Sequence, residues 1–222
     1  MAERLGIPGL SSFKLYLIIT KTVAGTDLNP DKEQARMEQQ SMTYNERDII
    51  LGIRQGDRTA MKALYSRHVR YLTAVCSRYV LHAEDVRDVL QNAFLKIFSS
   101  VGDFEYRGEG SVRGWMARIV LNETLKFIKA DGRLTFVSLD EDNMDVAEEM
   151  PDIDGLPARM IHEAIRELPA GYRTVFNLYV MEGRSHKDIA RELNISESTS
   201  ASQLHRAKSM LAKKLRQLKT PE

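Results

Sequence analysis

Hydrophobic residues recur at three- and four-residue spacing between residues 45 and 129, with polar residues between them. The first run places Ile49, Ile50 and Ile53 on one face. Three further runs follow at 59–79, 83–98 and 112–129. This period is typical of amphipathic α-helices, because side chains three and four positions apart share a face. The pattern therefore predicts a compact four-helix domain over residues 45–130.

A second group of periodic runs occupies the C-terminal part of the chain. The expected helices are 157–168, 172–181, 185–194 and 196–218. Pro169 and Gly183 fall between them, where a helix is expected to stop. The fold class predicted for the chain is therefore all-α, with a second small helical domain over residues 156–219.

Two segments lack a helical period. Within residues 1–44, a short apolar run at 15–20 is followed by a polar, Gln-rich stretch at 23–42, which indicates either a disordered N-terminal extension or a start codon assigned too far upstream. Residues 131–155 are acidic, and such a segment buries too little apolar area to offset its ordering entropy. We expect a flexible acidic linker between the two domains.

Charge is segregated along the chain. The 222 residues contain 32 Lys plus Arg and 31 Asp plus Glu, for a net charge of +1. Residues 131–154 hold nine acidic residues and one basic residue, whereas 183–219 hold nine basic and three acidic residues. Binding to nucleic acid depends on the local field, so the basic C-terminal segment is a candidate DNA-binding surface.

The sequence favours neither a metal site nor a disulfide. The single cysteine, Cys76, lies in an apolar run, where we expect a buried, inert thiol and a cytoplasmic protein. The five histidines show no metal-ligand spacing, so neither a metal nor a cofactor is expected. No nucleophile–base set or phosphate-binding loop points to an enzyme.

The segment 183–215 has the pattern of a helix-turn-helix. Ser185 and Asp188 form a capping box, Asn194 suits the turn, and Ser196 can cap the following helix. The last helix begins with small hydroxyl residues and then becomes basic, as a helix entering the DNA major groove requires. The alternative is a helix pair that only packs.

Two sets of motifs resemble one family. Residues 168–215 resemble region four of the sigma-70 transcription initiation factors, with its L-P-x-x-x-R-x-V-F-x-L start (Leu168 to Leu178) and its L-x-R-A-K end (Leu204 to Lys208). DVLQNAFLKIF at 88–98 and SVRGWMARIVLNETLKFIK at 111–129 resemble region two. A chain with these two regions is similar to the extracytoplasmic-function (ECF) class of alternative sigma factors.

The resemblance implies three sets of binding residues. Those for the clamp of core RNA polymerase would be Asp88, Gln91, Asn92 and Lys96. Those for the downstream (−10) promoter element would be Arg113, Arg118, Asn122, Lys126 and Lys129. Those for the upstream (−35) element would be Ser198 and Ser202 on the exposed first turn of the last helix, followed by Gln203, Arg206 and Lys208. A further expected partner is an anti-sigma protein, for which membrane anchoring is one option.

Several assignments stay open at this stage. Phe104, Tyr106 and Arg107 could build a pocket for an unstacked base, although packing is equally expected for Phe104. Trp115 is expected to pack. The family often has basic residues where this chain has Ala201 and Gln203, and the Gln203 amide could pair with adenine.

Two alternatives concern the linker and the function. The acidic linker is either a solvated tether or a mimic of nucleic acid in a basic channel. A dimeric helix-turn-helix regulator is the alternative to a sigma factor, but it would not need the polar face of the 88–98 helix.

Overall fold

The computed structural model describes residues 45–130, 132, 134 and 155–219. Every regular element within these residues is an α-helix, so the predicted all-α class is confirmed. The chain divides into two compact units between Phe127 and Ile128, in the last turn of helix α6. The predicted N-terminal extension and all but a few residues of the predicted linker lie outside the described residues.

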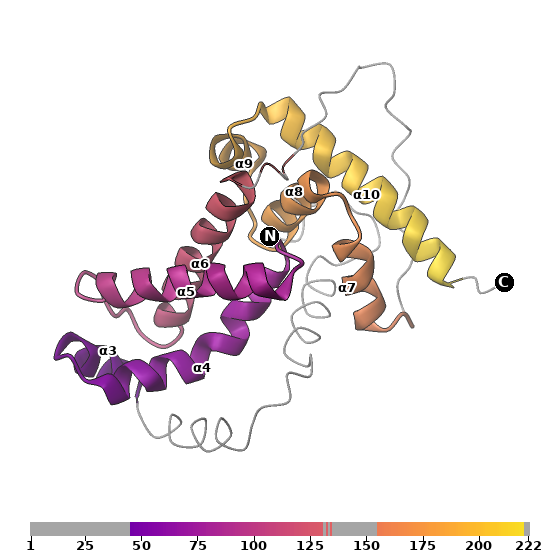
Figure 1. The fold of residues 1–222 in the computed structure, drawn as a ribbon. Helices are drawn as coiled ribbons and strands as arrows, with labels where there is room; N and C mark the ends of the chain where they lie inside the picture. The colour runs from indigo at the N-terminus through magenta and orange to yellow at the C-terminus, as the bar shows by residue number, and fades with distance from the viewer. Residues whose placement is uncertain (1–44, 131, 133, 135–154, 220–222) are drawn as a thin grey trace. The chain divides into compact units, whose positions relative to one another are not determined.

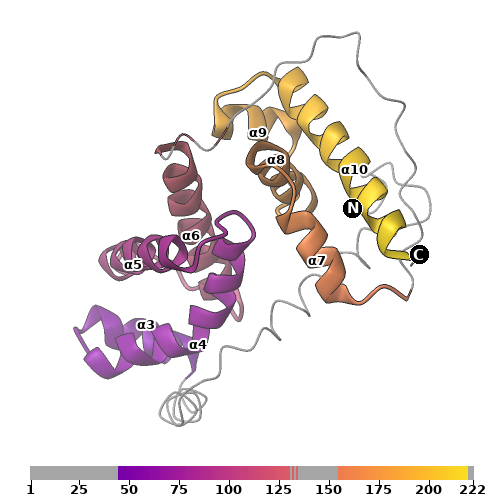
Figure 2. The ribbon, with the colours of Figure 1, turned by 45° about the vertical axis from the view of Figure 1, so that its right-hand side comes forward.

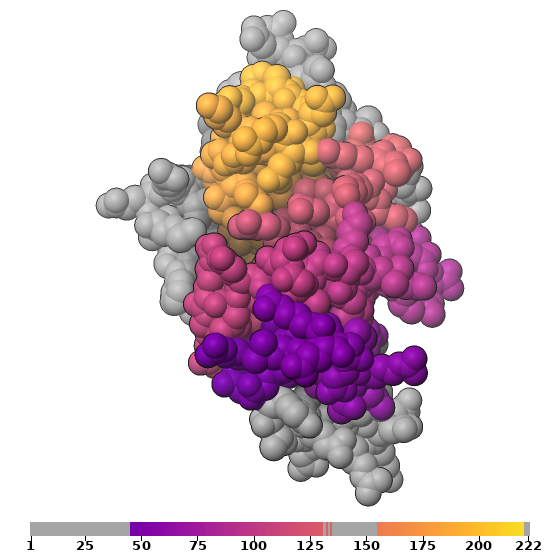
Figure 3. All heavy atoms as spheres, turned by 90° about the vertical axis from the view of Figure 1, so that its left-hand side faces the viewer, coloured from indigo at the N-terminus to yellow at the C-terminus, as the bar shows by residue number. Residues whose placement is uncertain are grey.

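Between residues 45 and 130, the first unit contains the helices α3 (Glu46–Arg54), α4 (Arg58–Ser77), α5 (Ala83–Ser100) and α6 (Ser111–Ala130) (Figure 1). α4 packs against both α3 and α5. The atoms of α3, drawn in indigo, reach the surface of the molecule (Figure 3). Asp57 caps α4, since its carboxylate accepts the Thr59 amide proton at 2.7 Å.

The apolar faces predicted from the sequence form the core of this unit. Ile49, Ile50 and Ile53 of α3 are all buried, as the first hydrophobic run indicates. Cys76 is fully buried, and the Thr124 hydroxyl donates to its sulfur at 3.4 Å. Burial raises the pKa of the Cys76 thiol to about 11, which keeps it protonated and inert at neutral pH.

The second unit contains α7 (Ala158–Arg166), α8 (Ala170–Val180), α9 (His186–Leu193) and α10 (Glu197–Lys219). α10 is the longest helix, and it packs against α7, α8 and α9 (Figure 2). Its apolar stripe is fully buried at Ala207, Leu211 and Leu215. This stripe follows the helical period, so one face of α10 joins the three shorter helices.

A buried arginine of α8 stabilises the segment that connects α7 to α8. Arg173 is 6% exposed, and its guanidinium donates to the carbonyl oxygens of Leu168 at 2.7 Å and Arg166 at 3.0 Å. These carbonyls belong to the end of α7 and the segment after it, where a helix leaves its last acceptors unpaired. Arg173 of the L-P-x-x-x-R motif is therefore a structural residue in this fold.

Candidate functional site

The outer face of α5 carries all four residues predicted to bind the polymerase. Asp88, Gln91, Asn92 and Lys96 are all exposed, because the buried residues of α5 occupy the opposite face. Leu95 is 64% exposed and lies three residues after Asn92 on the same stripe. Leu95 is absent from the predicted site, although its spacing from Asp88 and Gln91 places it on this face. The stripe combines polar groups with one large apolar side chain, a combination suited to a protein partner.

The structure connects this face to α6 through a carboxylate that sequence analysis also missed. Glu123 accepts from Lys96 of α5 at 2.6 Å and from Lys126 of α6 at 3.1 Å. Burial alone would raise the pKa of the Glu123 carboxyl, but the two hydrogen bonds lower it overall. Two lysines predicted for different partners therefore share one anion.

The predicted stripe on α6 lies on its outer face. Arg118, Asn122, Lys126 and Lys129 are all exposed. Arg113, one turn earlier, places its guanidinium 3.8 Å from the centre of the Tyr71 ring, an interaction that holds it against α4. The stripe is basic and exposed, as a surface that contacts DNA backbone requires.

The aromatic residues before α6 pack together. Phe104 is buried, and its ring centre lies 4.5 Å from that of Trp115. Trp115 thus packs as expected, and Phe104 takes the packing role that the sequence left open. Tyr106 is half-buried and Arg107 is exposed in the same loop, where Arg107 pairs with Glu105 at 3.0 Å.

The helix-turn-helix forms as the sequence predicts. Ser185 caps α9, because its hydroxyl oxygen accepts the Asp188 amide proton at 3.1 Å and its proton goes to the Asp188 carboxylate at 2.6 Å. Asn194 ends α9 in the left-handed region, with φ 58° and ψ 50°. Ser196 caps α10 by accepting the Thr199 amide proton at 2.9 Å. Asn tolerates this backbone conformation better than most residues, which explains its place in the turn.

A histidine absent from the predicted site joins the two helices. His186 Nδ1 lies 3.0 Å from the hydroxyl oxygen of Ser200, and the His186 ring stacks on Tyr179 with ring centres 4.8 Å apart. Burial and the nearby Lys208 ammonium lower the pKa of His186, so the ring is favoured in its neutral form. α8, α9 and the start of α10 are held together at this point.

Two residues predicted to read DNA are not on the surface. Gln203 is 1% exposed and Ser202 is 9% exposed, so the expectation that both are exposed is wrong. The helical period explains the difference, because Gln203 shares a face with the buried Ser200 and Ala207. Their polarity indicates exposure, whereas their spacing along α10 places them on the buried face.

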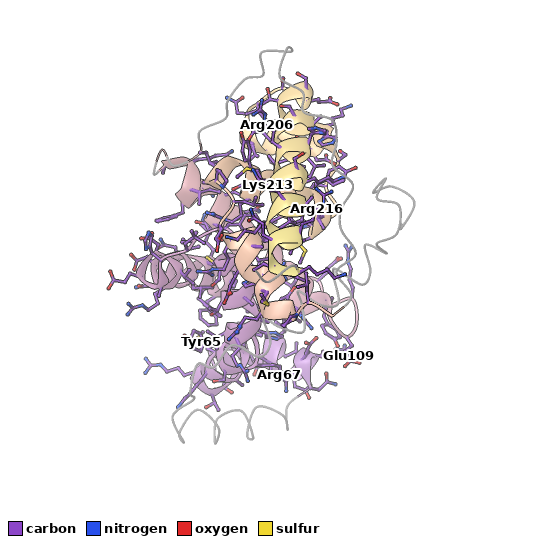
Figure 4. All side chains as sticks on the ribbon, turned by 90° about the vertical axis from the view of Figure 1, so that its right-hand side faces the viewer. Tyr65, Arg67, Glu109, Arg206, Lys213 and Arg216 are labelled. Carbon is purple, nitrogen blue, oxygen red and sulfur yellow. The ribbon has the colours of Figure 1, made fainter. Side chains whose placement is uncertain are left out.

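The remaining predicted residues of α10 are accessible. Ser198 is exposed, whereas Arg206 and Lys208 are half-buried. Burial lowers the pKa of Lys208. Arg206, Lys213 and Arg216 follow one another along α10 (Figure 4), and Lys213 and Arg216 are exposed. The accessible part of α10 thus keeps the expected basic residues and Ser198 but lacks Ser202 and Gln203.

Neither a metal centre nor a membrane span stands out among the residues that the structure describes. Within 45–130, 132, 134 and 155–219, His, Cys, Asp and Glu side chains nowhere gather in threes as metal ligands would. No helix in the same ranges combines the length and apolar character needed to cross a bilayer.

Comparisons with known proteins match both parts of the chain. The family model described as Sigma-70 region 2 matches residues 64–134, and that described as Sigma-70, region 4 matches residues 158–211. The ECF RNA polymerase sigma-E factor of Haemophilus influenzae is 29% identical over 182 residues, which cover 77% of this chain and 95% of that protein. The ECF RNA polymerase sigma factor SigM of Mycobacterium tuberculosis is 32% identical over 165 residues, or 74% and 82% of the two chains.

A search of solved structures gives a more distant likeness. The structure of CnrH in complex with the cytosolic domain of CnrY aligns with 76% of this chain and 95% of the matched chain. The sequence identity is 21% and the TM-score is 0.40.

Proposed function

The chain belongs to the extracytoplasmic-function class of sigma-70 family sigma factors, and on this premise we propose which of its surfaces bind polymerase and promoter DNA. It is an alternative sigma factor that binds core RNA polymerase and directs promoter-specific transcription initiation. Residues 45–130 would bind the polymerase clamp and the downstream element, and residues 156–219 the upstream element. The segment 131–155 would connect the two.

The polymerase-binding surface is the outer face of α5. The observation that supports it most is the continuous exposure of Asp88, Gln91 and Asn92 beside Leu95. A truncated hydrophobic contact at the centre of an interface costs more than a rim charge, so Leu95 would contribute most of the affinity. Lys96 would contribute less, because its ammonium is already paired with Glu123.

The downstream element would be bound along α6. An exposed stripe along this helix is formed by Arg118, Asn122, Lys126 and Lys129. Arg113 would contact DNA from its position over the Tyr71 ring. Contacts of this kind neutralise phosphates, so they position the strand and make binding sensitive to salt.

The upstream element would be bound by the accessible surface of α10. Ser198 lies in the first turn, and Arg206 and Lys208 lie within three turns of it. Ser202 and Gln203 would act through packing, because their side chains are buried. Base preference would then depend on the exposed first-turn residues, and Arg206 would supply a phosphate contact.

A separate anti-sigma protein would control the factor by covering the outer face of α5, the start of α10, or both. The family is commonly held silent in this way. The 222 residues contain one cysteine, and its buried, protonated thiol is unsuited to a redox switch. A pull-down from cells grown without inducing stress tests this proposal. The proposal would be contradicted if the protein were recovered only with polymerase or without any partner, and if the purified protein were fully active whatever the growth condition.

The α5 surface is tested by titrating core polymerase against the full chain. We expect Leu95→Ala, and Asp88→Arg combined with Gln91→Ala, to weaken association at least tenfold, since each removes contacts from one interface. Asp48→Arg is the matched control, because Asp48 is an exposed acid on α3 of the same unit. Circular dichroism checks that the fold persists. Unchanged polymerase affinity in both α5 variants would refute the assignment.

A further inference from the structure

Both ends of the loop at 101–110 are attached to α3, a helix that lies about fifty residues earlier in the chain. At one end, Arg54 Nε donates to the carbonyl oxygen of Val101 at 3.2 Å, and its Nη2 donates to that of Phe104. At the other end, the Gly110 amide donates to Glu46 Oε2 at 3.3 Å. Three hydrogen bonds thus connect one short helix to the start and the finish of one loop.

The geometry of α3 suits it to span the loop. Glu46 and Arg54 are its first and last residues, so they lie about 12 Å apart along the helix axis at a rise of about 1.5 Å per residue. The isoleucines of α3 hold it against α4. The other carboxylate oxygen of Glu46 lies 3.9 Å from His68 Nε2 of α4, which is too far for a hydrogen bond.

The loop itself carries exposed groups between its two attachments. The exposed residues of the loop include Glu105, Arg107 and Glu109. Phe104 is buried and packs against Trp115. Gly108 and Gly110 adopt φ of 103° and 81°, so the loop depends on conformations that only glycine adopts easily. The loop also has contacts of its own, since the Arg107 amide donates to Ser111 Oγ at 3.2 Å and Phe104 packs on Trp115. The hydrogen bonds from α3 add one attachment at each end of the loop.

We infer that Glu46 and Arg54 are positioning residues that hold the 101–110 loop in the conformation that engages the downstream promoter element. This inference rests on the proposed function, because the loop joins the polymerase-binding helix α5 to the DNA-binding helix α6. The region 2 match begins at residue 64, so α3 lies before it. α3 therefore contributes to promoter discrimination without touching DNA itself.

Two measurements on the full chain test the inference. The first is the rate of tryptic cleavage after Arg107 under native conditions, followed by mass spectrometry. The second is the ratio of transcription by reconstituted holoenzyme from a selected promoter to that from the same promoter with a scrambled downstream element. A general loss of activity would lower both transcription rates and leave this ratio unchanged.

The variants remove one attachment at a time. We expect Arg54→Met to speed cleavage after Arg107 about tenfold and to lower the promoter ratio severalfold, because it removes both charge-assisted donors. Glu46→Leu should also speed cleavage and lower the promoter ratio, because it frees the other end of the loop. Glu46→Gln keeps an acceptor oxygen for the Gly110 amide, so its cleavage rate and promoter ratio should stay close to those of the wild type. Arg47→Met is the matched control, since Arg47 is an exposed residue of α3.

Three results distinguish failure of this inference from failure of the proposed function. Faster cleavage after Arg107 with an unchanged promoter ratio, in either Arg54→Met or Glu46→Leu, would overturn the positioning role. An unchanged cleavage rate in both variants would also overturn it. A wild-type holoenzyme that transcribes both promoters equally would overturn the proposed downstream-element contact, and the inference with it.

Discussion

Acid should destabilise the first unit through one buried histidine. His68 of α4 is 5% exposed, and the Arg67 and Arg113 guanidinium groups lie near it. Burial, reinforced by these two cations, lowers the pKa of His68 from 6.5 to about 4. Glu46 is the acidic partner, at 3.9 Å from Nε2. In the folded protein His68 therefore stays neutral down to about pH 4, whereas in the unfolded chain it becomes protonated below its ordinary pKa of 6.5.

The sign and size of the effect follow from linkage. Between pH 6.5 and about 4 the unfolded state binds more protons than the folded state, so the free energy of unfolding falls as the pH falls. Each pH unit in this window is worth about 1.4 kcal/mol for one group, so His68 alone should account for a loss of about 3 kcal/mol. The contribution is fully present above pH 6.5 and is gone at about pH 4.

The single tryptophan makes this measurable in the full chain. Trp115 lies in the same unit as His68, so its fluorescence in urea titrations reports unfolding of that unit. We expect His68→Gln to remove about 3 kcal/mol from the difference between unfolding at pH 7 and at pH 4. His82→Gln, at an exposed histidine, is the control. Equal acid sensitivity in wild type and His68→Gln would refute the reasoning.

Three further predictions concern the second unit. Arg173→Met should lower the stability of this unit by about 2–4 kcal/mol in far-UV circular dichroism and leave the Trp115 transition unchanged, because one buried and one part-buried carbonyl lose a charged donor. Asn194→Val should cost about 1–2 kcal/mol in the same assay, whereas Asn194→Gly should cost little, since φ at this position is 58°. Arg206→Ala should weaken binding to all promoters about equally and reduce the salt slope by about one, whereas Gln203→Ala should leave the selected upstream sequence unchanged. A changed upstream sequence for Gln203→Ala would show that this amide reads a base.

The sequence by itself determined the features that depend on neighbours along the chain. The three- and four-residue period predicted the helices and their buried faces, because a helix brings those positions together whatever surrounds it. Ser185, Asn194 and Ser196 were predictable for the same reason, since a cap or a left-handed turn involves residues two to four positions apart. The outer face of α5 follows once its inner face is known.

Tertiary structure decided every feature that depends on which elements meet. The helical period places Gln203 on the same face as Ala207, but the packing of α10 against α8 and α9 decides that this face is covered even at a polar residue. Glu123 joins lysines from two helices, and Arg54 reaches carbonyls 47 and 50 residues away. No periodicity within one helix encodes such contacts, because they depend on how whole helices and loops pack. Local order along the chain thus specifies the helices and their caps, and packing specifies which polar side chains remain available for binding.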